Sequence, residues 1–106
     1  MRGGISVAAQ YTIDQLKNII TPIAKQYGVE SISLFGSYSK GNPTDQSDVD
    51  LKVEKGRLKS LFQLCGFRLA VEDALHLPVD LITTEASDPD FLDMIARDEV
   101  LLYRKS

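Results

Sequence analysis

Residues 34–53 read LFGSYSKGNPTDQSDVDLKV, and the pattern of apolar, polar and turn-forming residues within them is the main evidence for the predicted fold. Apolar and polar residues alternate before Gly36 and again from Val49 onward, and a period of two is typical of half-buried strands. Between these two runs, glycine, proline, asparagine and serine are dense, which indicates a loop. Together with the preceding residues 30–33 (ESIS), the stretch predicts one strand at 30–35, a turn and a loop, and a second strand at 49–53.

Outside this stretch, the pattern predicts three helices and two further strands. Thr12 and Gln15 form a capping box ahead of apolar residues at helical spacing, and Pro22 should kink or restart the helix that follows. The predicted helices span 12–27, 57–75 and 89–97, and the predicted strands span 79–83 and 100–103. This order predicts an α/β (α+β) domain in which helices flank a small mixed β-sheet.

The helix expected at 57–75 has apolar residues that the spacing assigns mostly to one face. That face comprises Leu58, Leu61, Phe62, Cys65, Leu69 and Leu75. We interpret Leu58, Leu61, Phe62 and Leu69 as core first and as a surface for a partner second, and Cys65 as core packing.

The composition sets limits on the classes of function. The chain has 106 residues, a net charge of -3 and 43% hydrophobic residues, which suits one domain (11–106) behind a flexible lead (1–10) to which no function is assigned. An acidic balance argues against direct binding of nucleic acid. A single cysteine fits a reducing cytoplasm, and no signal peptide or membrane span is recognisable.

Three carboxylates are the main candidates for chemistry. Asp48 and Asp50 stand two apart on a predicted strand, so their side chains share a face and repel each other unless a cation lies between them. Mg²⁺ prefers such oxygens. Asp80 would add a third carboxylate if its strand lay beside theirs, and two metal ions could then clamp a phosphoryl displacement. Taken singly, each feature could equally be a solvated acid on a strand.

Gly36-Ser37 is the second candidate feature. A glycine lets the backbone approach an anion, and free N–H groups at the helical turn expected at 37–41 could hold a phosphate with the Ser37 hydroxyl. Lys40 could add a positive charge. By itself the pair is more often a plain turn. The spacing does not fit a Walker A loop, and Val53 occupies the position where a calcium-binding EF-hand needs glycine.

Gly36-Ser37, ten residues, and then Asp48-Val49-Asp50 together resemble the signature of the DNA polymerase β-like nucleotidyltransferase superfamily. The local text resembles its minimal nucleotidyltransferases (MNT), and the resemblance extends from about Thr12 to Arg104. Lys40 departs from the family, which more often has arginine there. This change keeps the charge and loses the planar fork.

The resemblance implies the polymerase β-like fold and the transfer of a nucleotidyl group from a nucleoside triphosphate, expected to be ATP, with two Mg²⁺ ions. It implies that Asp48 and Asp50 bridge the metals and that Asp80 completes one metal site and helps to deprotonate the acceptor. It also implies that Gly36 and Ser37 contact the β- and γ-phosphates.

Stand-alone MNT proteins resemble the antitoxin half of HEPN/MNT toxin–antitoxin pairs, in which AMP is placed on a tyrosine of the HEPN RNase toxin. That reaction is the expected function here, with a HEPN-type toxin as partner and a homodimer or hetero-oligomer left open. Two alternatives stay open. One is an antitoxin that acts by binding alone, and the other is a transferase for a small-molecule hydroxyl.

Overall fold

The computed structural model describes residues 11–41, 43 and 48–105. The flexible lead expected at 1–10 and most of the loop expected at 41–47 lie outside these residues. The described elements are α1 (Ile13–Tyr27), β1 (Ser31–Phe35), β2 (Val49–Glu54), α2 (Leu61–Leu75), β3 (Val79–Thr83), α3 (Pro89–Ala96) and β4 (Val100–Arg104). All seven were predicted within a few residues.

The strands form one mixed sheet in the order β3-β2-β1-β4. β1 pairs antiparallel with β2 and with β4, and β2 pairs in parallel with β3. The parallel pair needs a crossover connection, which α2 provides. As a result β2 lies inside the sheet, and residues on it have a neighbouring strand on each side.

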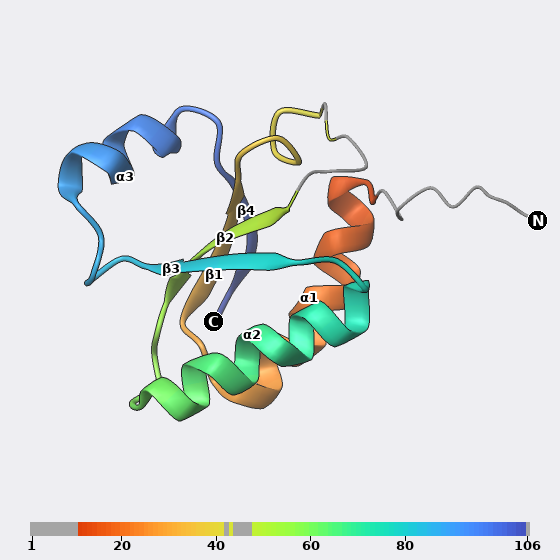
Figure 1. Ribbon diagram of the computed structural model, residues 1–106, viewed down its shortest axis with the longest axis vertical. Coiled ribbons are helices and arrows are strands. Elements are labelled where there is room, and N and C mark those ends of the chain that lie inside the picture. Colours follow the sequence, from red (N-terminus) through yellow and green to blue (C-terminus); the bar gives the residue numbers. More distant parts are fainter. Residues whose placement is uncertain (1–10, 42, 44–47, 106) are drawn as a thin grey trace, which may run out of the picture.

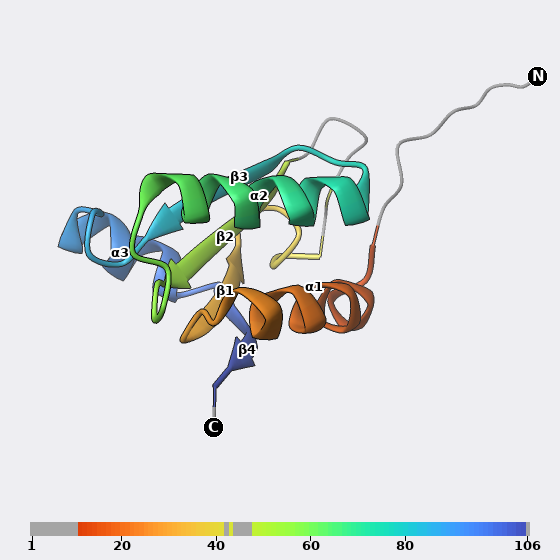
Figure 2. The same cartoon turned by 90° about the horizontal axis from the view of Figure 1, so that it is seen from below.

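One face of the sheet is covered by α1 and α2, which lie side by side, whereas α3 lies away from them at one end of the molecule (Figures 1 and 2). The fully buried core side chains come from α1, α2 and the strands. They include Leu16, Ile20, Ile32, Leu34, Val49, Leu51, Val53, Phe67 and Val71. No helix in the described part of the chain is long and apolar enough to cross a membrane.

The ends of α1 confirm the start and stop signals in the sequence. Thr12 and Gln15 form the predicted capping box, and Gly28 ends the helix in the left-handed conformation with a φ of 73°. The helix continues through Pro22, so the predicted restart is wrong. Pro22 costs the helix only the one backbone hydrogen bond that its missing N–H would have made. The burial of Leu16, Ile20 and Ala24 in the core outweighs this cost and keeps the helix continuous.

The predicted apolar face of the second helix is largely wrong. α2 begins after the cap residue Ser60, and it buries Phe67, Val71 and Leu75 against the sheet. Leu61, Phe62, Cys65 and Leu69 are exposed instead, and Leu58 is buried although it precedes the helix. The error arose because α2 is apolar on both sides, so that its periodicity does not identify the side facing the core.

The opposite face of the sheet carries polar side chains. On β2, Val49, Leu51 and Val53 are buried beneath the two helices, while the alternating residues Asp50, Lys52 and Glu54 face the other way and are half-buried. α3 contacts this face through Phe91, whose ring packs edge-on against Phe35 with 6.1 Å between the ring centroids. The candidate chemistry therefore lies on the face that α1 and α2 do not cover.

Candidate active site

The pairing of β2 with β3 brings two of the predicted acids together. The strands are parallel, and Asp50 is the register partner of Asp80. Residues paired in this way project from the same face of a sheet, so the two carboxylates are neighbours across the strands. Asp48 lies two residues before Asp50 on the same chain segment, immediately ahead of β2. The condition under which Asp80 would join the other acids, that its strand lies beside the Asp-x-Asp strand, is met.

Gly36 lies directly against the Asp50 carboxylate. A Cβ atom added to Gly36 would lie 2.2 Å from Asp50 Oδ2, and the glycine has a φ of 77°, which side chains disfavour. The contact arises because Phe35, the last residue of β1, is the register partner of Asp50. The Gly-Ser turn and the Asp-x-Asp strand, which are separate features in the sequence, therefore form one site.

The pKa of Asp50 is raised by its surroundings. Burial, and then the negative charges of Asp80 and Asp48, raise the pKa of the Asp50 carboxyl from 3.8 to about 6. Within the described residues, no ion pair includes Asp48, Asp50 or Asp80. The site thus has three acidic groups whose mutual repulsion a bound cation would relieve.

The three acidic side chains do not form a closed metal-binding cluster in this structure. Across residues 11–41, 43 and 48–105, no three His, Cys, Asp or Glu side chains converge tightly enough to hold a metal ion as they stand. The chemistry of the three carboxylates fits a hard divalent cation, and Asp48 and Asp80 are both exposed. Their role as metal ligands stays a prediction.

The backbone after Gly36 turns as the sequence predicted. Lys40 N–H donates to the Gly36 carbonyl at 3.2 Å, a hydrogen bond of the α-helical type, and the Ser39 hydroxyl donates to the same carbonyl at 2.8 Å. Ser37 is half-buried at the start of this turn, and Tyr38 packs into the core with 2% of its surface exposed. Burial raises the pKa of the Tyr38 hydroxyl, and the nearby Tyr11 raises it further.

A hollow of about 250 Å³ adjoins the turn, and it holds a residue that the sequence did not single out. Phe35, Gly36 and Lys40 line it from one side, and Met94, Ile95, Arg97 and Asp98 line it from α3 and the residues that follow. The sequence predicts a positive charge near the phosphates at Lys40, whereas Arg97 has the pattern of an ordinary solvated charge. No spacing rule connects these two cations, because Lys40 and Arg97 lie far apart in the sequence and come to the same hollow only where α3 docks.

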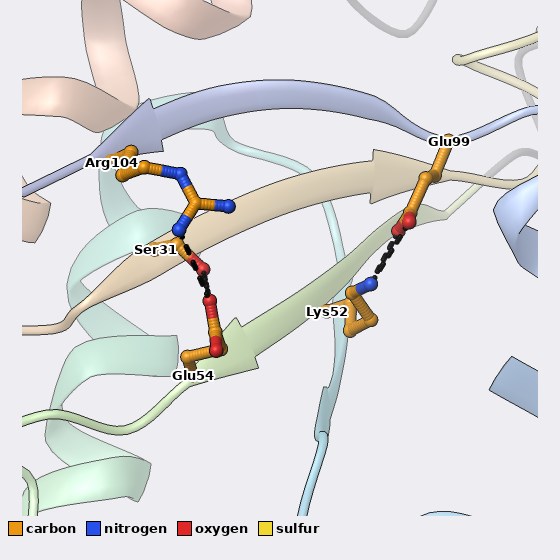
Figure 3. Close-up of polar contacts among 5 residues, drawn as sticks. All are labelled: Ser31, Lys52, Glu54, Glu99 and Arg104. Carbon is orange, nitrogen blue, oxygen red and sulfur yellow. Dashed lines mark hydrogen bonds and ion pairs between the residues drawn. The ribbon is translucent and has the colours of Figure 1, made fainter. Parts of the chain in front are cut away.

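Farther along the same face, the remaining charges are paired with one another (Figure 3). Lys52 Nζ lies 2.9 Å from Glu99 Oε1 and 2.7 Å from Oε2. Glu54 accepts a hydrogen bond from the Ser31 hydroxyl and lies 3.9 Å from Arg104. Lys52, the cation that follows Asp50 on the same side of β2, is thus held by Glu99 and is not the partner of Asp50.

Comparisons with known proteins agree with this geometry. Residues 17–106 match the family model of the polymerase beta nucleotidyltransferases. The chain is 35% identical over 88 residues to a Methanocaldococcus jannaschii protein that carries a protein adenylyltransferase name, and the match covers 83% of this chain and 95% of that protein. It is 29% identical over 96 residues to the protein adenylyltransferase MntA of Thermococcus cleftensis, covering 87% and 97%.

The fold is also similar to that of solved structures. A chain in the structure of a tri-AMPylated Shewanella oneidensis HEPN toxin in complex with an MNT antitoxin superposes with a TM-score of 0.68. The superposition covers 89% of this chain and 74% of that chain at 19% sequence identity. The predicted fold class, a mixed sheet with flanking helices of the polymerase β type, is confirmed.

Proposed function

Because this chain belongs to the polymerase beta nucleotidyltransferase family, and is therefore a nucleotidyltransferase, we propose that it transfers AMP from ATP to a tyrosine of a cognate HEPN-type toxin. The observation that carries the proposal is the contact between Gly36 and Asp50. It places the turn proposed to bind phosphate directly beside the carboxylates proposed to bind metal. Residues 11–106 are taken as one domain that acts in the cytoplasm.

Asp48, Asp50 and Asp80 are the proposed ligands of two Mg²⁺ ions. The ions, when bound, neutralise charge on the triphosphate and on the reacting oxygens. The raised pKa of Asp50 supports this assignment, since a carboxylate that is costly to ionise alone gains most from a cation. The Gly36-Ser37 backbone and the Ser37 hydroxyl hold the β- and γ-phosphates.

The reaction is a displacement at the α-phosphorus. The tyrosine oxygen of the acceptor forms a bond to this phosphorus, the bond to the β-phosphate oxygen breaks, and pyrophosphate leaves. Asp80, exposed at the edge strand β3, accepts the proton of the tyrosine hydroxyl. The contribution of the chain is to position the reactants and to hold charges in place.

A protein acceptor fits the openness of the site. The acids lie on a sheet face that α1 and α2 leave uncovered, and Asp48 and Asp80 are exposed. A partner protein would supply the missing wall. The relatives carry protein adenylyltransferase names, and the Shewanella oneidensis antitoxin was solved with an AMPylated HEPN toxin. These names support the proposed substrate class.

We expect a cognate HEPN-type toxin to gain AMP when it is incubated with this chain, ATP and Mg²⁺, as measured by intact mass. The gain should be absent without Mg²⁺ and with Asp48→Ala. A partner that is bound and silenced without any mass gain would favour an antitoxin acting by contact. The absence of both mass gain and complex would favour a small-molecule hydroxyl as acceptor.

We further expect Lys40→Ala and Arg97→Ala each to weaken ATP binding about tenfold, because each removes a cation beside the phosphates, where a charged hydrogen bond contributes about 1.5–3 kcal/mol. Titration with a non-hydrolysable ATP analogue measures the effect. Lys105→Ala, an exposed cation after β4, is the matched control and should bind normally. Equal affinities for Arg97→Ala and Lys105→Ala would remove Arg97 from the nucleotide site.

A further inference from the structure

The outer side of α2 carries an apolar stripe that nothing in the described chain covers. Phe62 is 91% exposed and Leu69 is 55% exposed, and Cys65 between them is exposed as well. Their spacing of three and four residues places them on one line along the helix. Phe62 contributes neither to the core nor to the acidic site, since the acids lie on the opposite face of the sheet. A contiguous exposed apolar stripe, unlike a single exposed ring, is typical of an interaction surface.

The charges at the two ends of this stripe run against the preference of an isolated helix. Lys59 lies just before the N-terminus of α2, and Asp73 lies in its last turn. The helix dipole favours the reverse arrangement, with acids first and bases last. Both side chains are exposed, and within the described residues neither forms an ion pair. The stripe is thus positive at one end and negative at the other.

Between these ends the surface is hollowed. Gly66 leaves the helix without a side chain at its middle, and the ring of Tyr27 on α1 lies 3.7 Å from where a Cβ would be. A shallow groove of about 460 Å³ lies here between α1 and α2, lined also by Leu69, Ala70 and Asp73. The stripe therefore presents a protruding ring at Phe62 and a recess beside Leu69, two turns farther along.

We propose that this stripe is the interface of a homodimer in which α2 packs antiparallel to α2 of a second copy. A two-fold axis beside Gly66 places Phe62 of each copy against Leu69 and the recess of the other. The same axis places Lys59 of each copy against Asp73 of the other, so these two charges meet their opposites. Arg68 and Glu72 pair within each helix. The two helix dipoles also oppose each other favourably. This self-complementarity is what an isologous interface requires, and it favours a second copy over an unrelated partner.

The test is the mass of the full chain in solution across a concentration series, by light scattering and sedimentation. We expect a monomer–dimer equilibrium. Phe62→Arg should raise the dissociation constant about thirtyfold or more, since a central aromatic residue dominates such interfaces. Lys59→Glu and Asp73→Lys should each raise it about tenfold or more, because each places like charges opposite one another. The double variant should dimerise as the unchanged chain does, because both charges are exchanged.

The rescue by the double variant is the decisive result, since misfolding would not be reversed by a second substitution. Leu101→Arg, which changes an exposed apolar residue on β4, is the matched control and should leave the dimer intact. Thermal melting checks that each variant is folded. A chain that is monomeric at every concentration overturns the proposal. So does a dimer that is insensitive to Phe62→Arg, or charge variants that do not rescue each other.

Discussion

Asp50→Asn should abolish nucleotidyl transfer and at the same time stabilise the folded chain at neutral pH. The loss of activity should reach at least about a hundredfold, because even residues that merely support metal ligands cost 10–100-fold when removed. The gain in stability follows from the charge, since the Asp50 carboxylate lies half-buried beside Asp80 and Asp48. Asparagine keeps the shape and removes the repulsion.

The stabilisation expected from Asp50→Asn depends on pH, because the Asp50 carboxyl has different pKa values in the folded and unfolded chains. In the unfolded chain the carboxyl ionises near 3.8, whereas in the folded chain its pKa is about 6. Between these values the folded state binds more protons than the unfolded state, so the contribution of Asp50 to stability falls as the pH rises. The melting temperature of Asp50→Asn minus that of the unchanged chain should therefore be near zero below about pH 4, increase up to about pH 6, and then stay constant.

Adding Mg²⁺ provides a second readout. At about pH 7 it should raise the melting temperature of the unchanged chain, because binding to the folded state alone stabilises that state, and it should have little effect on Asp50→Asn. Asp93→Asn, at an exposed acid on α3, is the control and should change neither activity nor the pH profile. A variant that is less stable than the unchanged chain at pH 7 would show that Asp50 supports the fold and is not a strained functional group.

Local signals in the sequence predicted the elements of this fold well. Capping residues such as Thr12 and Asp88, and the period of two around Asp50, depend on neighbours within a few positions, so their reading does not require the tertiary structure. The sequence could also show that Asp48 and Asp50 share a face. The resemblance to the family supplied the reason to connect them with Gly36 and Asp80.

The parts that the sequence could not predict depend on how elements dock. The exposed side of α2 was mistaken for core because Phe62 and Leu69 are as apolar as Phe67 and Val71. Arg97 reaches the hollow beside Gly36 only because α3 docks at that end of the sheet. The contact of Gly36 with Asp50 needs the register of β1 on β2, which no local pattern specifies.

Gly36→Ala should reduce transfer nearly as much as the loss of Asp50, although it removes no functional atom. The new Cβ would lie 2.2 Å from Asp50 Oδ2 and 3.1 Å from its Cγ, so the carboxylate must rotate away from the place where it serves the site. The backbone adds a second cost, since a φ of 77° in a residue other than glycine costs about 1–2 kcal/mol.

Gly41→Ala separates these two costs. Gly41 has a φ of 80° in the same turn, and apart from Gly41 and its chain neighbours no atom of residues 11–41, 43 or 48–105 lies within 4 Å of its added Cβ, so alanine there incurs the backbone cost without a collision with these residues. Both variants should lower the melting temperature, Gly36→Ala by at least as much as Gly41→Ala because it adds the collision to the backbone cost. Transfer measured by intact mass should fall about a hundredfold with Gly36→Ala and a few-fold at most with Gly41→Ala. In the double variant Gly36→Ala with Asp50→Asn, the losses should not add, because one substitution acts through the other. Equal activity of the two alanine variants would mean that the position of Asp50 against Gly36 is not what catalysis requires, and that the glycine serves the turn alone.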